Sequence, residues 1–235
     1  MSTDFKKISE DIKAGKIRKI KLLGDSITHG VGGTGYCMDG EAIAGGFSRN
    51  TNGYCWAKLF KGYLGEKYRV EVVNNACSGT RVEFILDHFD SLVDETDDLV
   101  ICMIGTNNRH QYMHTGEKKT REAWGKQFYD NLLKLYAKFQ QIGKRVVFMA
   151  NIPASAENEK DGKDYWRILH MDDINAIYKR AQEKTGFSFI SVYDLFTEYL
   201  AQRNEKVDKY LSDGLHPNDE GYRVMFSLIS KAYHL

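Results

Sequence analysis

A serine, a histidine and an aspartate of this 235-residue chain have the types and positions that nucleophilic catalysis requires. Ser26 stands two residues after Gly24, at the end of an apolar run that we predict to be the first strand, residues 17–23. Ligands of open α/β sheets bind outside the carboxyl ends of the strands, which is where this serine would lie. Its hydroxyl needs a base, because serine is a weak nucleophile until its proton is removed.

The stretch Asp213-Gly214-Leu215-His216-Pro217 supplies the base and its partner. His216 would accept the proton of Ser26 and later return it to the leaving group. Asp213 precedes His216 by three residues on the same short turn, so its carboxylate can reach the imidazole and fix the tautomer.

Three donors could stabilise a negatively charged oxygen in the transition state of acyl transfer. They are the backbone N–H groups of Ser26 and Gly79 and the side-chain amide of Asn107. Gly79 follows the second predicted strand, and its bare backbone lets a substrate approach closely. Asn107 follows the third predicted strand.

The elements that must position these groups alternate between strands and helices. We expect strands at residues 17–23, 68–74, 99–104, 145–150 and 187–192. We expect helices at residues 3–14, 54–64, 82–89, 120–142, 166–184, 193–202 and 219–233. This alternation predicts one α/β domain over residues 1–235, with a five-stranded parallel sheet and right-handed crossovers. The carboxyl ends of parallel strands meet at one edge, so distant residues can become neighbours there.

The composition excludes several classes of function. The 42% hydrophobic and 28% charged residues are typical of a globular protein, and a net charge of +1 favours neither nucleic acid nor an anionic membrane. No apolar run approaches a membrane span, and the polar start lacks the core of a signal peptide, which predicts a cytoplasmic protein. The four cysteines are then free thiols, although Cys37 and Cys55 could pair in an exported protein.

Other chemistries have weaker support. His110 and His114 are four residues apart, but no acidic ligand stands nearby in the sequence, so we expect no metal site. Residues 30–33 are glycine-rich but lack the lysine of a phosphate-binding loop, and we expect no cofactor. Thr28 occupies the place of the second glycine in a Gly-x-Ser-x-Gly elbow, which disfavours the α/β-hydrolase fold.

Together these motifs resemble the SGNH (GDSL-type) esterase and lipase superfamily. The resemblance rests on four blocks in the family's order: Gly24-Asp25-Ser26-Ile27, Asn75-Ala76-Cys77-Ser78-Gly79, Gly105-Thr106-Asn107-Asn108 and Asp213-Gly214-Leu215-His216-Pro217. It implies a flavodoxin-like three-layer α/β/α fold and a metal-free hydrolase of carboxylic esters. Ile27 replaces a frequent leucine, which is a neutral apolar change. Asn108 replaces an aspartate, which puts some hydrogen bonds around Asn107 in question.

The substrate that we expect is a small ester, above all an acetylated sugar. Residues 31–53, 109–120 and 154–166 would form the rim of the site, where we expect Arg81, Arg109 and Tyr112 to contact substrate. The rim also offers Arg49 and Tyr165, and its polar and aromatic groups suit a carbohydrate better than a long acyl chain. The alternatives are a lysophospholipase or thioesterase, an acetyltransferase with the same triad, and a binding module without activity.

Overall fold

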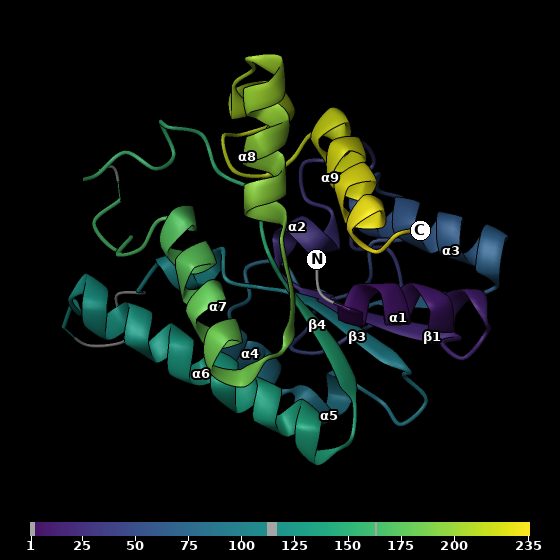
Figure 1. Cartoon of the computed structure of the whole chain (residues 1–235). Helices are drawn as coiled ribbons and strands as arrows, with labels where there is room; N and C mark the ends of the chain where they lie inside the picture. The colour runs from purple at the N-terminus through teal and green to yellow at the C-terminus, as the bar shows by residue number, and fades with distance from the viewer. Residues whose placement is uncertain (1–2, 112–116, 163) are drawn as a thin grey trace.

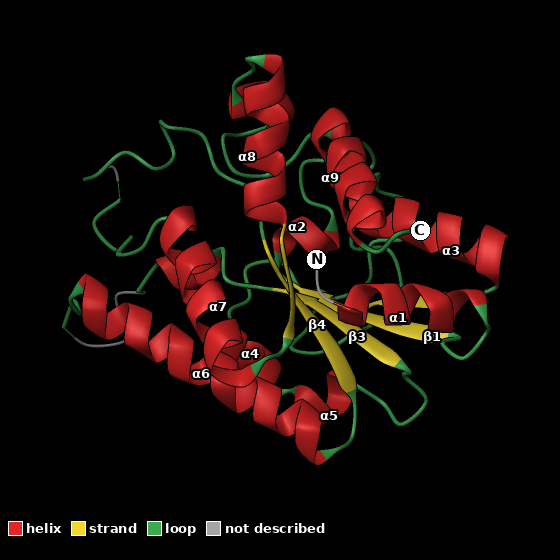
Figure 2. Cartoon of the chain, in the orientation of Figure 1, coloured by secondary structure: helices red, strands yellow, loops and turns green. Residues whose placement is uncertain are grey.

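A five-stranded, all-parallel sheet forms the centre of the computed structural model, which describes residues 3–111, 117–162 and 164–235 (Figures 1 and 2). The strands are β1 (Lys19–Gly24), β2 (Glu71–Asn74), β3 (Leu99–Met103), β4 (Arg145–Ala150) and β5 (Ser188–Ser191). They lie in the order β2-β1-β3-β4-β5, and every neighbouring pair is parallel. The predicted fold class is therefore confirmed.

Helices cover both faces of this sheet and give the structure three layers (Figure 2). One face carries α1 (Thr3–Lys13), α3 (Trp56–Tyr68), α8 (Val192–Arg203) and α9 (Asp219–Ala232). The other face carries α4 (Val82–Asp87), α5 (Phe89–Leu92), α6 (Arg121–Gln141) and α7 (Met171–Thr185). A strand covered on both faces is apolar throughout, as β3 is: all five of its residues are buried.

The strand order places a topological switch point between β1 and β3. The chain leaves β1 for β2 on one side and then crosses to β3 on the other, and such a point is where open sheets bind ligands. Gly24 and Met103 are paired at the carboxyl ends of the two strands. A Cβ on Gly24 would lie 2.5 Å from the Met103 carbonyl oxygen, so glycine permits the close approach of the two strand ends.

The helix expected over residues 166–184 begins five residues later, at Met171. The backbone N–H of His170 donates to Asp173 Oδ2 at 2.8 Å and starts the helix there. The preceding residues are instead paired with the loop after β3, where Ile168 N–H donates to the Arg109 carbonyl at 2.8 Å. The helix predicted over residues 82–89 is also interrupted, and α4 and α5 meet at His88.

The glycine-rich stretch 31–53 is a long loop, as expected, whose regular pairing among the described residues is a single bridge between Ala42 and Ser48. Cys37 is exposed and Cys55 is buried, and both are free thiols, so they do not pair in this structure. Across the described residues, we find no helix with the length and apolar character needed to cross a membrane.

Candidate active site

Ser26 is the first residue of α2 (Ser26–His29), a single turn that follows β1 directly. Asp25 caps this turn, because its Oδ1 accepts a hydrogen bond from the Ile27 N–H at 3.1 Å. The turn ends at Gly30, whose φ of 109° is accessible mainly to glycine. The strand end and the capped turn together hold the Ser26 side chain in a nearly buried position.

His216 and Asp213 lie beside this serine in a hydrogen-bonded line. Nε2 of His216 is 2.8 Å from Ser26 Oγ, and Nδ1 of His216 is 2.7 Å from Asp213 Oδ2. The second carboxylate oxygen of Asp213 accepts the backbone N–H groups of Leu215 at 3.0 Å and His216 at 2.8 Å. One oxygen of Asp213 therefore stabilises the turn that carries His216, and the other orients the imidazole so that Nε2 faces Ser26.

The hydrogen bonds of this turn also set the charge of Asp213. Burial by itself would raise the pKa of the carboxyl, but the hydrogen bonds from the His216 backbone and ring outweigh that effect, so the pKa lies below its ordinary value. The carboxylate thus stays ionised well into the acid range, which favours a proton on Nδ1 and leaves Nε2 to face Ser26.

Gly79 and Asn107 come together at the same edge of the sheet. The Asn107 amide donates from Nδ2 to the Thr80 carbonyl at 2.9 Å, which ties the loop after β3 to the loop after β2. Since an amide nitrogen carries two hydrogens, the second can serve another acceptor. Gly79 has a φ of 73°, and a Cβ there would meet no atom within 4 Å, so its backbone faces open space.

Asn108, which stands where the family pattern has an aspartate, forms hydrogen bonds through both atoms of its amide. Its Oδ1 accepts the Val82 N–H at 3.0 Å, as an aspartate would. Its Nδ2 donates to Glu83 Oε2 at 3.0 Å, which an ionised aspartate could not do. The asparagine therefore fits a site that already contains the carboxylate of Glu83.

A buried polar network behind the serine was missed by sequence reasoning. Oδ2 of Asp25 accepts the Thr106 N–H at 3.2 Å and Nδ2 of Asn151 at 3.0 Å. Burial raises the pKa of Asp25, and the hydrogen bonds from Thr106 and from Ile27 offset part of this effect. Asn151 directly follows β4, so its place at the end of a strand was the available signal.

His29 fastens the long loop to the turn that bears the serine. Its Nε2 is 2.9 Å from the Ser48 carbonyl, which can only accept, so Nε2 carries the hydrogen and Nδ1 accepts from the Tyr36 hydroxyl at 3.3 Å. Burial raises the pKa of Tyr36, and the side chain of Ser78, the residue before Gly79, opposes this in part. Tyr36, a rim residue that the sequence did not single out, thus lies next to the candidate oxyanion donors.

The predicted substrate contacts have different locations. Arg109 was expected on the rim, and this placement was wrong: the side chain is only 1% exposed, because it forms an ion pair with Glu159 beneath the surface. Arg81 is half-buried at the start of α4, near Glu83. Tyr112 lies outside the described residues.

His110 lies near a carboxylate but belongs to no larger group of potential metal ligands among the described residues. His110 has an acidic neighbour after all, Asp164 at 3.0 Å, whereas His114 lies outside the described residues. Within the described part of the chain, no group of three or more metal-ligating side chains occurs.

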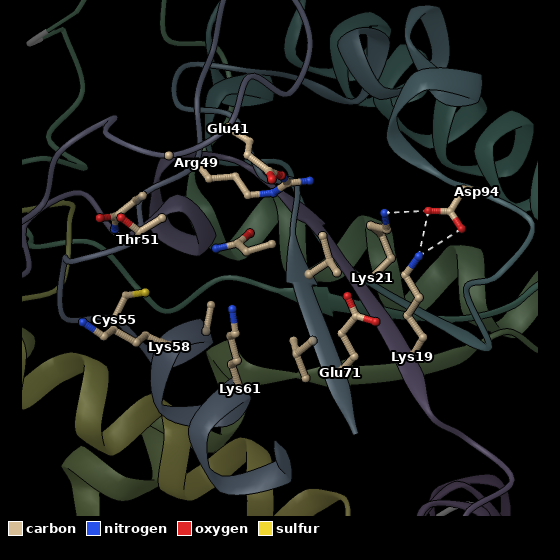
Figure 3. Close-up of a pocket in the computed structure, with 16 residues that line it drawn as sticks. Lys19, Lys21, Glu41, Arg49, Thr51, Cys55, Lys58, Lys61, Glu71 and Asp94 are labelled. Carbon is tan, nitrogen blue, oxygen red and sulfur yellow. Dashed lines mark hydrogen bonds and ion pairs between the residues drawn. The ribbon is translucent and has the colours of Figure 1, made fainter. Parts of the chain in front are cut away.

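A cavity of about 590 Å³ opens along β2, and Figure 3 shows that lysines from β1 and α3 line it. Neither Ser26 nor His216 lines this cavity. Lys19 and Lys21 both reach Asp94 at 3.1 Å, so these two cations already have a partner.

Comparison with known proteins identifies one matching sequence family and several solved structures with a similar fold. The sequence model of the GDSL-like Lipase/Acylhydrolase family matches residues 22–224. A comparison with curated proteins finds no significant match.

Several solved structures share the fold. The acetylxylan esterase Axe2 from Geobacillus stearothermophilus is 20% identical, with a TM-score of 0.67 over 93% of this chain and 94% of that one. LAE5, an alpha/beta hydrolase enzyme from the metagenome of Lake Arreo, is 23% identical, with a TM-score of 0.68 over 92% and 95%. A putative GDSL-like lipase from Parabacteroides merdae is 17% identical, with a TM-score of 0.66 over 92% and 95%.

Proposed function

The chain belongs to the GDSL-like lipase/acylhydrolase family and is a carboxylic ester hydrolase, and on this premise we propose that it removes acetyl groups from a carbohydrate through an acyl-enzyme. The observation that carries the proposal is the line of contacts from Ser26 Oγ to His216 at 2.8 Å and from His216 to Asp213 at 2.7 Å. This is the geometry of a nucleophile, a general base and the group that orients the base.

In the first half of the reaction, Ser26 Oγ attacks the ester carbonyl carbon while its proton moves to Nε2 of His216. The tetrahedral intermediate collapses when the bond to the alcohol oxygen breaks, and His216 gives its proton to that oxygen. In the second half, water attacks the acetyl-enzyme, again losing a proton to His216. The Ser26–acetyl bond then breaks, and the serine recovers its proton as acetate leaves.

The negative charge of the intermediate needs donors that are already in place. The backbone N–H groups of Ser26 and Gly79 and the amide of Asn107 fill this role. Two observations support the assignment. A Cβ on Gly79 would meet no atom within 4 Å. The Asn107 amide donates to the carbonyl of Thr80, the residue after Gly79. Asp213 stays ionised and stabilises the imidazolium that forms in each half.

The choice of an acetylated sugar is supported by the rim and by one of the similar structures. Tyr36 contributes a half-buried hydroxyl beside Ser78, and Tyr165 is 65% exposed in the segment that follows β4. Aromatic rings with polar edges suit the apolar faces and hydroxyl groups of a sugar. Axe2, which shares the fold, acts as an acetylxylan esterase.

The test is a series of nitrophenyl esters of increasing acyl length, assayed beside acetylated xylo-oligosaccharides. We expect kcat/KM to be highest for acetate and to fall with each added pair of carbons, and we expect acetate to be released from the oligosaccharide. Ser26→Ala is the control for uncatalysed hydrolysis. A rate that rises with chain length would favour the lysophospholipase or thioesterase alternative. Acetyl transfer to an added sugar in place of water would favour the acetyltransferase.

A further inference from the structure

Arg109 is a buried cation that the reaction itself does not use. It ends the short 3₁₀ turn Asn107–Arg109 after β3, two residues beyond the candidate oxyanion donor, and only 1% of its surface is exposed. A buried charge is costly unless it is paired and hydrogen-bonded. The position of its partners therefore indicates which parts of the fold this residue holds together.

On one side, Arg109 is joined to the loop that carries Asn107. Its Nε donates to the Thr106 carbonyl at 3.0 Å, so the guanidinium is fixed to the residue just before Asn107. Thr106 in turn donates its backbone N–H to Asp25 at 3.2 Å, directly behind Ser26. Hydrogen bonds thus link the guanidinium to the residue before Asn107 and, through it, to the residue before Ser26.

On the other side, Arg109 reaches the segment after β4. Its Nη1 donates to Asn158 Oδ1 at 3.2 Å and forms an ion pair with Glu159 Oε1. The second oxygen of Glu159 is buried and has no hydrogen-bond partner among the described residues, although His170 Nδ1 lies 3.9 Å from it. Arg109 is therefore the closer of the two side chains that pair with this carboxylate. Removing the arginine alone would leave this largely buried carboxylate without its hydrogen-bonded cation.

Asn158 and Glu159 belong to a tight turn that touches the acid–histidine loop. Both donate their backbone N–H groups to Ser155, to Oγ and to the carbonyl respectively, each at 3.0 Å. The N–H of Ser155 donates to the Gly214 carbonyl at 2.8 Å. A Cβ on Gly214 would lie 2.8 Å from Ser155 Oγ, so the two loops are in direct contact between Asp213 and His216.

We propose that Arg109 is a positioning residue that fixes the Asp213–His216 turn relative to Asn107 and Ser26, acting through Glu159 and the Ser155 turn. The proposal rests on the function proposed above for these residues. A displacement of the imidazole by a fraction of an ångström would lengthen its contact with Ser26, and misplaced catalytic groups lower the rate more than they weaken binding. Arginine is required because its planar fork serves Thr106 and Asn158 at once, which lysine cannot do.

Two variants test this. Arg109→Lys keeps the charge but loses the fork, and the double variant Arg109→Gln with Glu159→Gln removes both charges, so no buried charge is left unpaired. With nitrophenyl acetate, we expect kcat to fall roughly 10–100-fold and KM to change less than about 3-fold. Arg121→Gln is the matched control, because Arg121 is an exposed arginine whose ion pair is with Asp173 at the start of α7.

A second measurement separates positioning from general stability. In the Asp213→Asn background, Arg109→Lys should cost little further activity, since the orientation that it protects is already lost, whereas independent effects would multiply. The downfield proton resonance of the His216 Nδ1–H should shift or broaden in Arg109→Lys but not in Arg121→Gln.

The results can also contradict the proposal without ambiguity. If folded Arg109→Lys and the double variant both turn over as the wild type does, with only a lower Tm, Arg109 is a structural residue and the proposal is wrong. Effects of Arg109→Lys and Asp213→Asn that multiply fully would overturn it too. If instead the wild type lacks esterase activity, or Ser26→Ala retains it, the proposed function fails first.

Discussion

Ser26 Oγ lies 2.8 Å from Nε2 of His216, although 190 positions separate the two residues in the chain. The contact forms because the loop after β1 and the turn before α9 meet at the carboxyl edge of the parallel sheet. This distance is that of a hydrogen bond, which a general base requires in order to remove the serine proton.

Ser26 should be the residue that a fluorophosphonate labels. An imidazole at hydrogen-bond distance activates its hydroxyl, whereas other serines of the chain react slowly. We expect one label per chain, located at Ser26 by peptide mass spectrometry, and complete loss of esterase activity. Ser78→Ala serves as a control, since Ser78 directly precedes Gly79 but the hydrogen bond of His216 Nε2 is with Ser26. Full activity in Ser26→Ala would contradict the assignment.

Asp213→Asn should lower kcat on the order of 10²–10⁴-fold, because an amide facing Nδ1 favours the wrong imidazole tautomer. The hydrogen bonds that lower the pKa of Asp213 keep it charged as the pH falls, so this carboxylate should not limit activity in the mildly acid range. The measurement is kcat against pH for both proteins. Asp208→Asn is the control at a nearby aspartate outside the site. Near-normal turnover of Asp213→Asn would mean that another group orients His216.

Asn107→Ala should lower kcat roughly 10²–10³-fold with little change in KM, since the amide binds the oxyanion more tightly than the ground-state carbonyl. The lost hydrogen bond to Thr80 should cost about 1 kcal/mol of stability, or about 2–4 °C in Tm. Asn107→Asp should be at least as slow, because a carboxylate cannot donate. A variant that melts early but turns over normally would leave Asn107 with a structural role alone.

His29 should make the fold sensitive to acid. Burial lowers the pKa of His29 below its ordinary value of 6.5, with the hydrogen bond to Ser48 opposing this in part. Between pH 6.5 and the lowered pKa, the unfolded chain binds more protons than the folded one, so the free energy of unfolding should rise with pH in this window.

The test is urea denaturation at several pH values. His29→Gln can still donate to the Ser48 carbonyl but does not titrate, so its stability should vary less with pH over this window than that of the wild type. An identical slope in His29→Gln and the wild type would show that other groups account for the acid sensitivity.

Chelators should leave the rate unchanged, because the proposed steps use only protein side chains and water. Incubation with EDTA followed by assay on nitrophenyl acetate is the measurement. A loss of activity that zinc or another divalent cation restores would rule out the metal-free mechanism and would require ligands outside the proposed site.

The local pattern of the chain was enough to predict the order and type of the main elements. Apolar runs such as 99–104 can satisfy their backbone only as covered strands, and the structure has β3 there. Boundaries were less well predicted where tertiary contacts decide them. The pairing of Ile168 with Arg109 delays the start of α7 to Met171, and no propensity within residues 166–170 encodes that contact.

The residues that could act together were recognisable from local motifs, because Ser26, Gly79, Asn107 and His216 each occur in a short motif at a predicted strand end or late turn. Their relative positions were not, because these depend on the packing of the whole fold. The tertiary structure set the 2.8 Å contact of the base, and it placed Arg109 beneath the surface rather than on the rim. The physical reason is that motifs specify side-chain chemistry locally, whereas distance and burial depend on how segments far apart in sequence pack together.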